Sequence, residues 1–247
     1  MKDIEQNYED FISTVSHELR TPLTSIRGFS QTMLSSWDKL DDESKKKFIK
    51  IIEEQSNRLI HLVENMLSVT KLNSGTSRLV YNEVEVNKLI EQTIAIVKSQ
   101  YPTQKFIFNQ AKNLPNIFVD KDKFQQILTN IIENSAKYSS EILTTEISTS
   151  SLDNNVIIKI SNQGAAINKE DYENIFKKFS RIDNPLTRKV QGSGLGLYIT
   201  KTLIEKMGGN ITVSSLPTEN PELGKNTFTL TIPIKSIEEE ARIKCNL

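Results

Sequence analysis

The N-terminal part of the chain carries apolar side chains at alternating spacings of three and four positions. This is the period of an amphipathic helix, so residues 1–37 are predicted to form one long helix. A polar turn follows at residues 40–44, where acidic side chains can cap a new helix that ends near Gly75. The two apolar seams are Ile4, Phe11, Val15, Leu19, Ile26, Phe29 and Met33, and Phe48, Ile52, Gln55, Leu59, Leu62, Met66 and Val69.

The second seam alternates in steps of four and three, which is typical of coiled-coil packing between helices. Core packing explains these residues, and no other role is assigned to them. Two such helices form a hairpin, and a hairpin alone leaves much of its apolar surface in water. Pairing of two hairpins would bury that surface, so the pattern predicts a dimeric four-helix bundle.

Beyond Leu79, short β-type runs alternate with helical runs. The β-type runs are 105–108, 117–119, 141–148, 156–160, 210–213 and 227–233, and the helical runs are 86–98, 121–138 and 195–207. Strands gathered against helices on one side make an α/β sandwich, which is α+β in class. The predicted fold is therefore multidomain, α and α+β, with a helical hairpin over residues 1–74, a sandwich over 75–235 and a C-terminal tail over 236–247.

The composition indicates the cellular environment of the chain but says little about its function. Lys plus Arg number 31 and Asp plus Glu number 31, so no overall charge favours nucleic acid or an anionic membrane. Cys245 is the only cysteine, which excludes an internal disulfide and agrees with a reducing cytoplasm. No apolar run is long enough to cross a membrane, and the charged N-terminus is unlike a signal peptide. We expect a cytoplasmic chain without membrane contact.

His17 is the chemically distinctive residue of the first helix. It lies off the apolar stripe, with Glu18 beside it and Thr21 one turn further on the same side. Most single histidines on helices are ordinary surface residues. An exposed neutral imidazole is also a nucleophile, however, and an adjacent carboxylate can take the proton from its second nitrogen. His61 has no such neighbours and is interpreted as a surface residue.

The stretch Ser16-His-Glu-Leu-Arg-Thr-Pro-Leu-Thr24 resembles the phosphoacceptor box of sensor histidine kinases almost letter for letter. The resemblance implies that His17 takes the γ-phosphoryl group of ATP. It also implies that Glu18 is the general base and that Thr21 positions water when the partner is dephosphorylated. Residues 1–74 would then be the dimerisation and phosphoacceptor domain, and residues 75–235 the catalytic ATP-binding domain.

Asn130 and Asn134 lie four residues apart, on one face of the predicted helix 121–138. An isolated pair of asparagines is more often simply exposed to solvent and binds no ligand. Its oxygens can nevertheless place a Mg²⁺ ion that takes its other ligands from water and phosphates. Followed by Ala-Lys-Tyr-Ser, the pair resembles the N box of the same family. The resemblance implies Mg²⁺ at Asn130 and Asn134, with Lys137 near phosphate and Tyr138 near the nucleotide.

The stretch Gln191-Gly-Ser-Gly-Leu-Gly-Leu-Tyr198 opens the last predicted helix. Glycines let backbone amides approach a phosphate where the helix dipole also favours an anion. The spacing differs from the G-x-G-x-x-G turn of dinucleotide-binding folds, and the stretch does not open a parallel βαβ unit. It resembles the second glycine box of the kinase family, which implies nucleotide contacts for Gly192, Gly194, Leu195 and Gly196.

Two further stretches extend the resemblance over residues 11–233. Ile175-Phe-Lys-Lys-Phe179 resembles the F box of the family. The segment that follows it would be a mobile lid whose Arg181 and Arg188 meet the phosphates. Gly224-Lys-Asn-Thr227 resembles the last glycine box, which implies a nucleotide contact for Thr227.

One box departs from the family pattern. Where the family has Asp-x-Gly-x-Gly-Ile, this chain has Asn162-Gln-Gly-Ala-Ala-Ile167. The resemblance still implies nucleotide contacts for Asn162, Gly164 and Ile167. An amide keeps an acceptor oxygen but loses the charge that strengthens such a bond, and it can rotate, so weaker and less selective adenine binding is expected. The alternative is that Asn162 is only a turn residue after the strand 156–160.

The resemblance predicts ATP-dependent autophosphorylation of His17, transfer to an aspartate of a separate response regulator, and dephosphorylation of that regulator. Two other classes stay open. One is a docking module in which the altered adenine box has abolished the use of ATP. The other is a hydrolytic ATPase of the gyrase, Hsp90 and mismatch-repair type, whose water-activating glutamate would stand at Asn130. Since no base is present there, transfer to His17 is expected to win.

The chain begins inside a coiled-coil helix with no sensor before it, and it contains no receiver-like domain. We therefore expect a piece of a larger protein, and a membrane-anchored parent is left open. The sequence does not indicate the stimulus, the regulator, or whether phosphorylation occurs within or between subunits.

Overall fold

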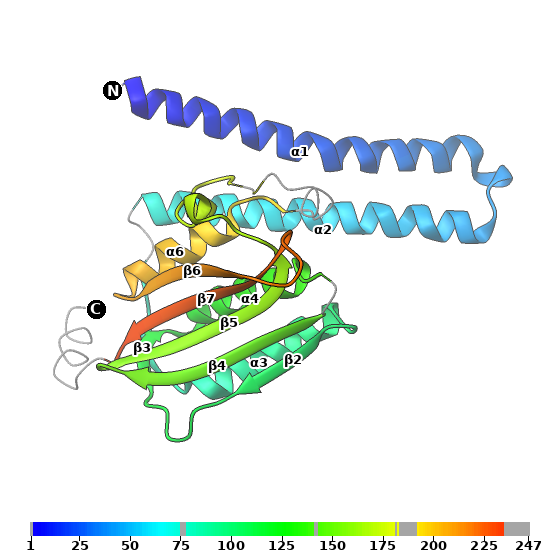
Figure 1. Cartoon of the computed structure of the whole chain (residues 1–247). Helices are drawn as coiled ribbons and strands as arrows, with labels where there is room; N and C mark the ends of the chain where they lie inside the picture. The colour runs from blue at the N-terminus through cyan, green and yellow to red at the C-terminus, as the bar shows by residue number, and fades with distance from the viewer. Residues whose placement is uncertain (1, 75–77, 141–142, 181, 183–191, 235–247) are drawn as a thin grey trace. The chain divides into compact units, whose positions relative to one another are not determined.

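The computed structural model describes residues 2–74, 78–140, 143–180, 182 and 192–234, with the side chains of residues 2–12 and Asn73 left aside (Figure 1). The chain divides into two compact units, Met1–Thr70 and Lys71–Leu247. The sequence predicts the domain boundary after residue 74, a few residues C-terminal to this division after Thr70. The predicted tail 236–247 falls outside the described residues. None of the described helices has the length and apolar character needed to span a membrane.

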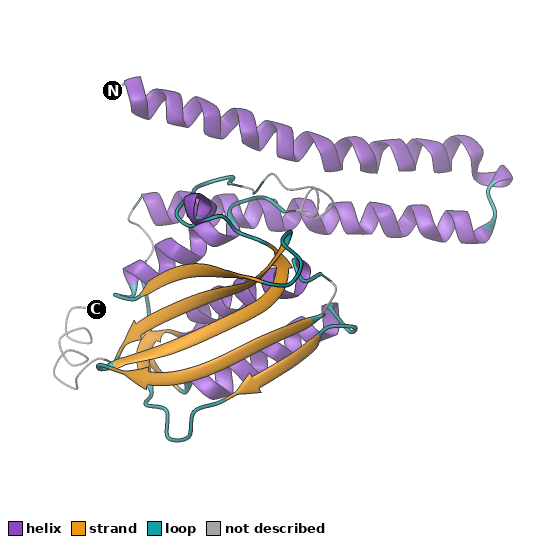
Figure 2. Ribbon diagram, in the orientation of Figure 1, coloured by secondary structure: helices purple, strands orange, loops and turns teal. Residues whose placement is uncertain are grey.

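The first unit is a helical hairpin, as the apolar seams predict (Figure 2). Helix α1 (Lys2–Ser36) leads through the short 3-10 turn η1 (Trp37–Lys39) into α2 (Asp42–Asn73). The rings of Phe29 and Phe48 lie 5.1 Å apart across the hairpin. Met33, Leu62 and Val69 are buried. Residues of both predicted seams therefore form the core of this unit.

Apolar side chains also face solvent on the hairpin. Six of them are between 45% and 85% exposed: Leu23, Leu34, Ile49, Ile60, Val63 and Leu67. Exposed apolar side chains on a helix can be buried by association with another helix. These residues would be covered in the predicted dimer.

Gly28 lies inside α1, and apart from its own helix backbone nothing lies within 4 Å of the place a Cβ would take. Alanine is favoured over glycine in a helix by about 1 kcal/mol. Gly28→Ala is therefore expected to raise the free energy of unfolding by about 1 kcal/mol, measured by urea denaturation at fixed protein concentration. A decrease instead would indicate that a second copy packs closely against Gly28.

Asp41 caps the start of α2. Its Oδ1 accepts from the Ser44 backbone N–H at 2.7 Å, and its Oδ2 accepts from the Ser44 hydroxyl at 3.0 Å. These bonds to Ser44 lower the pKa of the Asp41 carboxyl below its ordinary value of 3.8. The cap therefore stabilises the hairpin fully above pH 3.8, and its contribution is lost as the pH falls through the lowered pKa.

Hydrogen exchange at the Ser44 amide, followed from neutral pH downward, measures this loss. Once corrected for intrinsic exchange rates, protection should fall at acid pH in the wild type and should already be low at neutral pH in Asp41→Asn. Asp38→Asn, three residues earlier, is the control that should keep the wild-type profile. A wild-type profile in Asp41→Asn would mean that the carboxylate does not hold the helix start.

The second unit is built on a five-stranded mixed sheet in the order β2-β4-β5-β7-β6 (Figure 1). Its strands are β2 (Lys105–Asn109), β4 (Thr144–Leu152), β5 (Asn155–Ala165), β6 (Asn210–Pro217) and β7 (Leu223–Pro233). Strands β2 and β4 are parallel, and the other neighbours are antiparallel. Strands β1 (Tyr81–Val84) and β3 (Ile117–Asp120) form a separate antiparallel pair.

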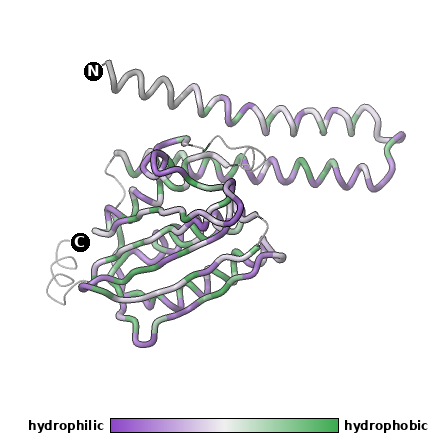
Figure 3. The backbone as a smooth tube through the Cα atoms, in the orientation of Figure 1, coloured by the Kyte–Doolittle hydropathy of each residue, from purple (hydrophilic) through white to green (hydrophobic). Residues whose placement is uncertain are grey.

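Helices α3 (Val86–Gln100), α4 (Lys121–Lys137) and α6 (Gly196–Lys206) cover one face of the sheet. Two 3-10 turns, η2 (Lys169–Asp171) and η3 (Asn174–Phe176), follow β5. Apolar positions recur along α4 and the central strands (Figure 3). The fully buried core between them includes Phe124, Ile127, Leu128, Ile131, Ile132, Ile147, Ile158, Ile160, Leu230 and Ile232. The predicted α+β sandwich is therefore confirmed, and none of the described helices of this unit covers the other, helix-free face of the sheet (Figure 1).

The structure differs from the sequence-based expectation mainly at strand ends. Strand β1 was not predicted, β5 continues to Ala165, and β7 already begins at Leu223. Residues 161–165 and 223–226 are rich in Ser, Asn and Gly, which disfavour strands locally. They are extended because each pairs with the other strand across the ladder, from Ser161 opposite Thr227 to Ala165 opposite Leu223.

Candidate functional site

His17 and Thr21 lie one turn apart on α1, and both are exposed, as the helical period predicts. The Thr21 hydroxyl donates to the His17 backbone carbonyl at 3.4 Å. Pro22 is buried beside them. The imidazole of His17 is therefore open to solvent on the polar side of the hairpin.

Glu18 is held by an ion pair across the hairpin. Its Oε2 lies 3.3 Å from Nη2 of Arg58 on α2, and the two side chains are 22% and 23% exposed. A charge-assisted contact of this kind orients the carboxylate beside His17. Sequence reasoning missed Arg58 because only the antiparallel pairing of the helices brings it opposite Glu18. His61 is exposed, 3.5 Å from Glu64, which confirms the surface interpretation.

In the second unit, Asn130 on α4 faces the start of α6. Its Nδ2 donates to the Thr200 hydroxyl at 2.7 Å, which leaves Oδ1 as the acceptor of this side chain. A Cβ on Gly196 would collide with the same Oδ1, so a larger residue there would require the Asn130 side chain to move. Asn134 follows one turn later on α4 and is half-buried. The contact to Thr200 was not predicted, because Thr200 belongs to no recognised motif.

The glycine-rich stretch leads into α6 at Gly196, as predicted. Gly194 has φ +66°, and a Cβ there would lie 2.7 Å from the Phe179 backbone. The position of a Cβ on Gly192 lies 3.5 Å from the Tyr138 hydroxyl and 3.7 Å from the Lys137 ammonium. The end of α4 and the glycine turn therefore meet. Leu195 is fully buried, so its side chain belongs to the core.

Asn162 lies within β5, paired with Thr145 on one side and Asn226 on the other. The alternative that Asn162 is a turn residue is therefore wrong. The side chain is only 4% exposed. Its Nδ2 lies 3.0 Å from the position of a Cβ on Gly164, and the Tyr138 carbonyl oxygen occupies that position. Asn162, Gly164 and the end of α4 thus form one continuous cluster with the glycine turn.

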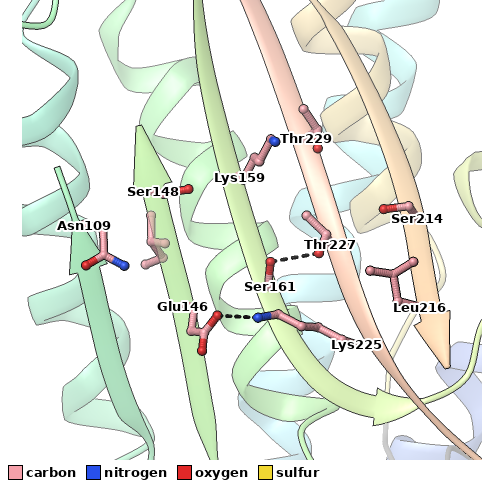
Figure 4. Close-up of a pocket in the computed structure, with 11 residues that line it drawn as sticks. Asn109, Glu146, Ser148, Lys159, Ser161, Ser214, Leu216, Lys225, Thr227 and Thr229 are labelled. Carbon is pink, nitrogen blue, oxygen red and sulfur yellow. Dashed lines mark hydrogen bonds and ion pairs between the residues drawn. The ribbon is translucent and has the colours of Figure 1, made fainter. Parts of the chain in front are cut away.

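Thr227, a further predicted nucleotide contact, lies apart from this cluster (Figure 4). Thr227 is on the helix-free side of the sheet, with its hydroxyl 2.9 Å from Ser161 Oγ. Ile167 follows β5, and its backbone N–H donates to Ser215 Oγ at 3.2 Å. Arg181 and Arg188 lie outside the described residues. The nucleotide contacts of these four residues stay predictions.

A polar cavity of about 370 Å³ lies on the helix-free face of the sheet (Figure 4). Side chains of all five strands line it: Asn109, Glu146, Ser148, Lys159, Ser161, Ser214, Leu216, Lys225, Thr227 and Thr229. An ion pair of 2.7 Å joins Lys225 to Glu146 within it. Because neighbouring residues of a strand point to opposite faces, the sheet separates this cavity from Asn162. It is therefore distinct from the cluster around Asn130 and the glycine turn.

Both units match known protein families. Residues 8–75 match the His Kinase A (phospho-acceptor) domain. Residues 119–236 match the histidine kinase-, DNA gyrase B- and HSP90-like ATPase family. The first match contains His17, and the second contains Asn130, Asn162 and the glycine turn.

The chain is 34% identical over 218 residues to the signal transduction histidine-protein kinase ArlS of Staphylococcus haemolyticus, covering 87% of this chain and 48% of that protein. It is 32% identical to the sensor histidine kinase WalK of Bacillus subtilis, covering 96% of this chain and 38% of that protein. The chain thus spans half or less of these relatives.

Among solved structures, the histidine kinase ThkA in complex with the response regulator protein TrrA superimposes with a TM-score of 0.73. The identity is 26%, and the match covers 95% of this chain and 64% of ThkA. The two domain matches and the similarity to whole kinases over nearly the full chain point to the same family. The chain belongs to the sensor histidine kinases of two-component systems, and it comprises their phosphoacceptor and ATPase domains.

Proposed function

We propose that this chain transfers the γ-phosphoryl group of ATP to His17 and passes it to an aspartate of a response regulator. The observation that supports this most directly is the meeting of the Asn130 amide with Gly196 at the start of α6. A helix N-terminus opened by glycines offers backbone N–H groups and a favourable dipole to phosphate. Lys137, beside Gly192, adds a cation at the same place.

The amide oxygens of α4 fit the proposed Mg²⁺. Asn130 Nδ2 is occupied by Thr200, so Oδ1 is the atom that remains to bind a cation. Oxygen ligands of this kind suit Mg²⁺, which keeps several waters and takes further ligands from phosphate. When bound, the ion would neutralise phosphate charge. Asn130 and Asn134 are the residues proposed to hold it. Arg181 and Arg188, in the segment that follows residues 175–179, are proposed to contact the phosphates.

In the proposed reaction, a ring nitrogen of neutral His17 attacks the γ-phosphorus in line, and the bond to the β,γ-bridging oxygen breaks to release ADP. The proton on the second ring nitrogen passes to Glu18. Arg58 holds the Glu18 carboxylate at 3.3 Å and limits its freedom beside the imidazole. The phosphoryl group then moves from His17 to the aspartate of the regulator. Dephosphorylation of that aspartate is assigned to a water held by Thr21.

The proposed active form is a homodimer. The exposed apolar residues of the hairpin, among them Leu34 at 85% exposure, supply the surface that two copies would bury. The regulator would dock near His17, which is exposed on the same hairpin.

Incubation of the chain with γ-labelled ATP and Mg²⁺ tests the proposal. A histidine kinase should incorporate label on the protein that is stable to base and labile to acid. A hydrolytic ATPase would release free phosphate and leave the protein unlabelled. A docking module without nucleotide use would do neither. It would also lack the stabilisation of about 2.7 kcal/mol expected with ATP at a hundred times its Kd.

A further inference from the structure

A row of paired residues crosses the helix-free face of the sheet through the polar cavity. Ser148 on β4 pairs with Lys159 on β5, and Lys159 pairs with Thr229 on β7. Paired residues of an antiparallel ladder place their side chains on one face about 5 Å apart. All three side chains line the cavity (Figure 4). One ammonium group is therefore flanked by a hydroxyl group on each side.

None of these three side chains has a hydrogen bond or an ion pair within the part of the chain that the structure describes. The ammonium group of Lys159 carries three donor N–H groups, and the hydroxyls of Ser148 and Thr229 each carry one donor O–H. The row therefore offers donors around one positive charge that no described side chain occupies.

The next row of the ladder adds a buried pair of hydroxyls to the cavity. Ser161 and Thr227 are paired residues, and their side-chain oxygens lie 2.9 Å apart. Ser161 is only 8% exposed, although no described helix covers this face. Only one hydroxyl proton can lie between the two oxygens, so the other hydroxyl still has its proton to donate. The pair thus keeps one donor for a molecule in the cavity.

The charges that line the cavity favour an anion. Lys225 neutralises the Glu146 carboxylate at 2.7 Å. Lys159 adds a positive charge that no described carboxylate balances. The cavity volume of about 370 Å³ lies at the lower end of the range of about 300–1,000 Å³ that is typical of small-molecule sites. Its size therefore suits a small ligand.

We propose that the ATPase domain carries a second ligand site on this face of the sheet, which binds a small molecule through a phosphate or carboxylate group. Lys159 and the hydroxyls of Ser148 and Thr229 donate to the oxygens of the anion, and the Ser161–Thr227 pair adds a further donor. Hydrogen bonds assisted by charge are about twice as strong as neutral ones, so an oxyanion is favoured over a neutral ligand. The site does not depend on the proposed function, since the sheet separates it from the nucleotide cluster.

Nuclear magnetic resonance titration of the ¹⁵N-labelled chain with phosphate and with succinate, at constant ionic strength, tests this. The amide signals of Ser148, Lys159 and Thr229 should shift and reach half-saturation at or below about 10 mM. Phosphate can also bind at the glycine turn, and the amides of Gly194 and Gly196 report that site separately. Saturation with either anion supports the proposal, and the tighter anion identifies phosphate or carboxylate as the recognised group.

Three variants locate the binding, and the amide spectrum of each shows that it folds. Lys159→Gln removes the cation and should weaken both anions at least about tenfold. Thr229→Val keeps the β-branched shape but loses the donor, and should weaken them at least about threefold. Lys105→Gln is the matched control, because Lys105 is exposed on β2, four residues from Asn109 and outside the cavity. It should bind both anions as the wild type does.

Two results would overturn the inference. One is that the wild-type shifts grow linearly with both anions and never saturate. The other is an equal loss of affinity in Lys159→Gln and Lys105→Gln, which would mean that the anions respond only to the overall charge of this face.

Discussion

His17→Gln is expected to abolish incorporation of acid-labile, base-stable phosphate from γ-labelled ATP. Glutamine keeps the helix and a polar side chain on the solvent face of α1 but has no nucleophilic nitrogen. The loss should exceed about a hundredfold, since a missing nucleophile leaves no alternative path to a phosphorus–nitrogen bond. Filter binding after base treatment and after acid treatment measures it.

The second histidine supplies a matched control. His61 is also exposed on the hairpin but has a side-chain partner of its own, Glu64 at 3.5 Å. His61→Gln should keep full labelling. ATP affinity should stay within about twofold in both variants, because the residues proposed to bind the nucleotide belong to the second unit. Label that persists in His17→Gln would refute the assignment, and label lost equally in both variants would indicate damage to the hairpin.

Thr21→Ala is expected to slow dephosphorylation of a phosphorylated regulator at least about tenfold, which corresponds to about 1.4 kcal/mol of transition-state stabilisation. The Thr21 hydroxyl is exposed one turn from His17 and makes only a long bond of 3.4 Å to the His17 carbonyl. It is therefore available to orient a water over a docked phosphoaspartate. Autophosphorylation should be largely spared, because that step needs the imidazole and not the water. Time courses of both reactions with the same preparation measure the difference.

Two further variants test whether the effect of Thr21→Ala comes from the loss of its hydroxyl. Thr32 makes the same type of bond, to the Gly28 carbonyl at 2.9 Å, further along α1, so Thr32→Ala should leave both activities unchanged. Thr21→Ser keeps a hydroxyl and should recover most of the dephosphorylation rate. An equal loss of both activities in Thr21→Ala would assign Thr21 to the local helix structure around Pro22 instead.

Periodicity predicted the elements of this chain well wherever a long apolar pattern was present. The two hairpin helices and helices α3, α4 and α6 were placed within a few residues of their observed ends. Strand β1 was missed because its four residues carry one buried apolar side chain, Val84, which is too little for a pattern. The end of β5 was missed because the ladder with β7 overrides the local preference of Asn162 and Gly164 for turns.

For the candidate site too, the sequence identified residues within local motifs but not the residues that contact them from distant elements. Motif recognition named Asn130, Tyr138, Asn162 and the glycine turn, and the structure brings them together. It missed Arg58 and Thr200. Each of these bonds to a motif residue from a separate element, across a sequence separation of at least 40 residues. Nothing in the local sequence distinguishes such residues, since their roles follow only from the packing of helices and strands that are distant in sequence.

The arrangement of the last three strands affects how the chain can vary over evolutionary time. Strands β5 and β6 both pair with β7, while the connection from β5 to β6 carries the glycine turn and α6 outside the sheet. The entropy of closing a loop grows only with the logarithm of its length, so doubling such a connection costs about 0.6 kcal/mol. Insertions between the packed elements of this connection, outside the 3-10 turns and α6, should therefore cost the sheet little stability. Related chains can thus differ in the length of this connection while the strands on either side keep their register.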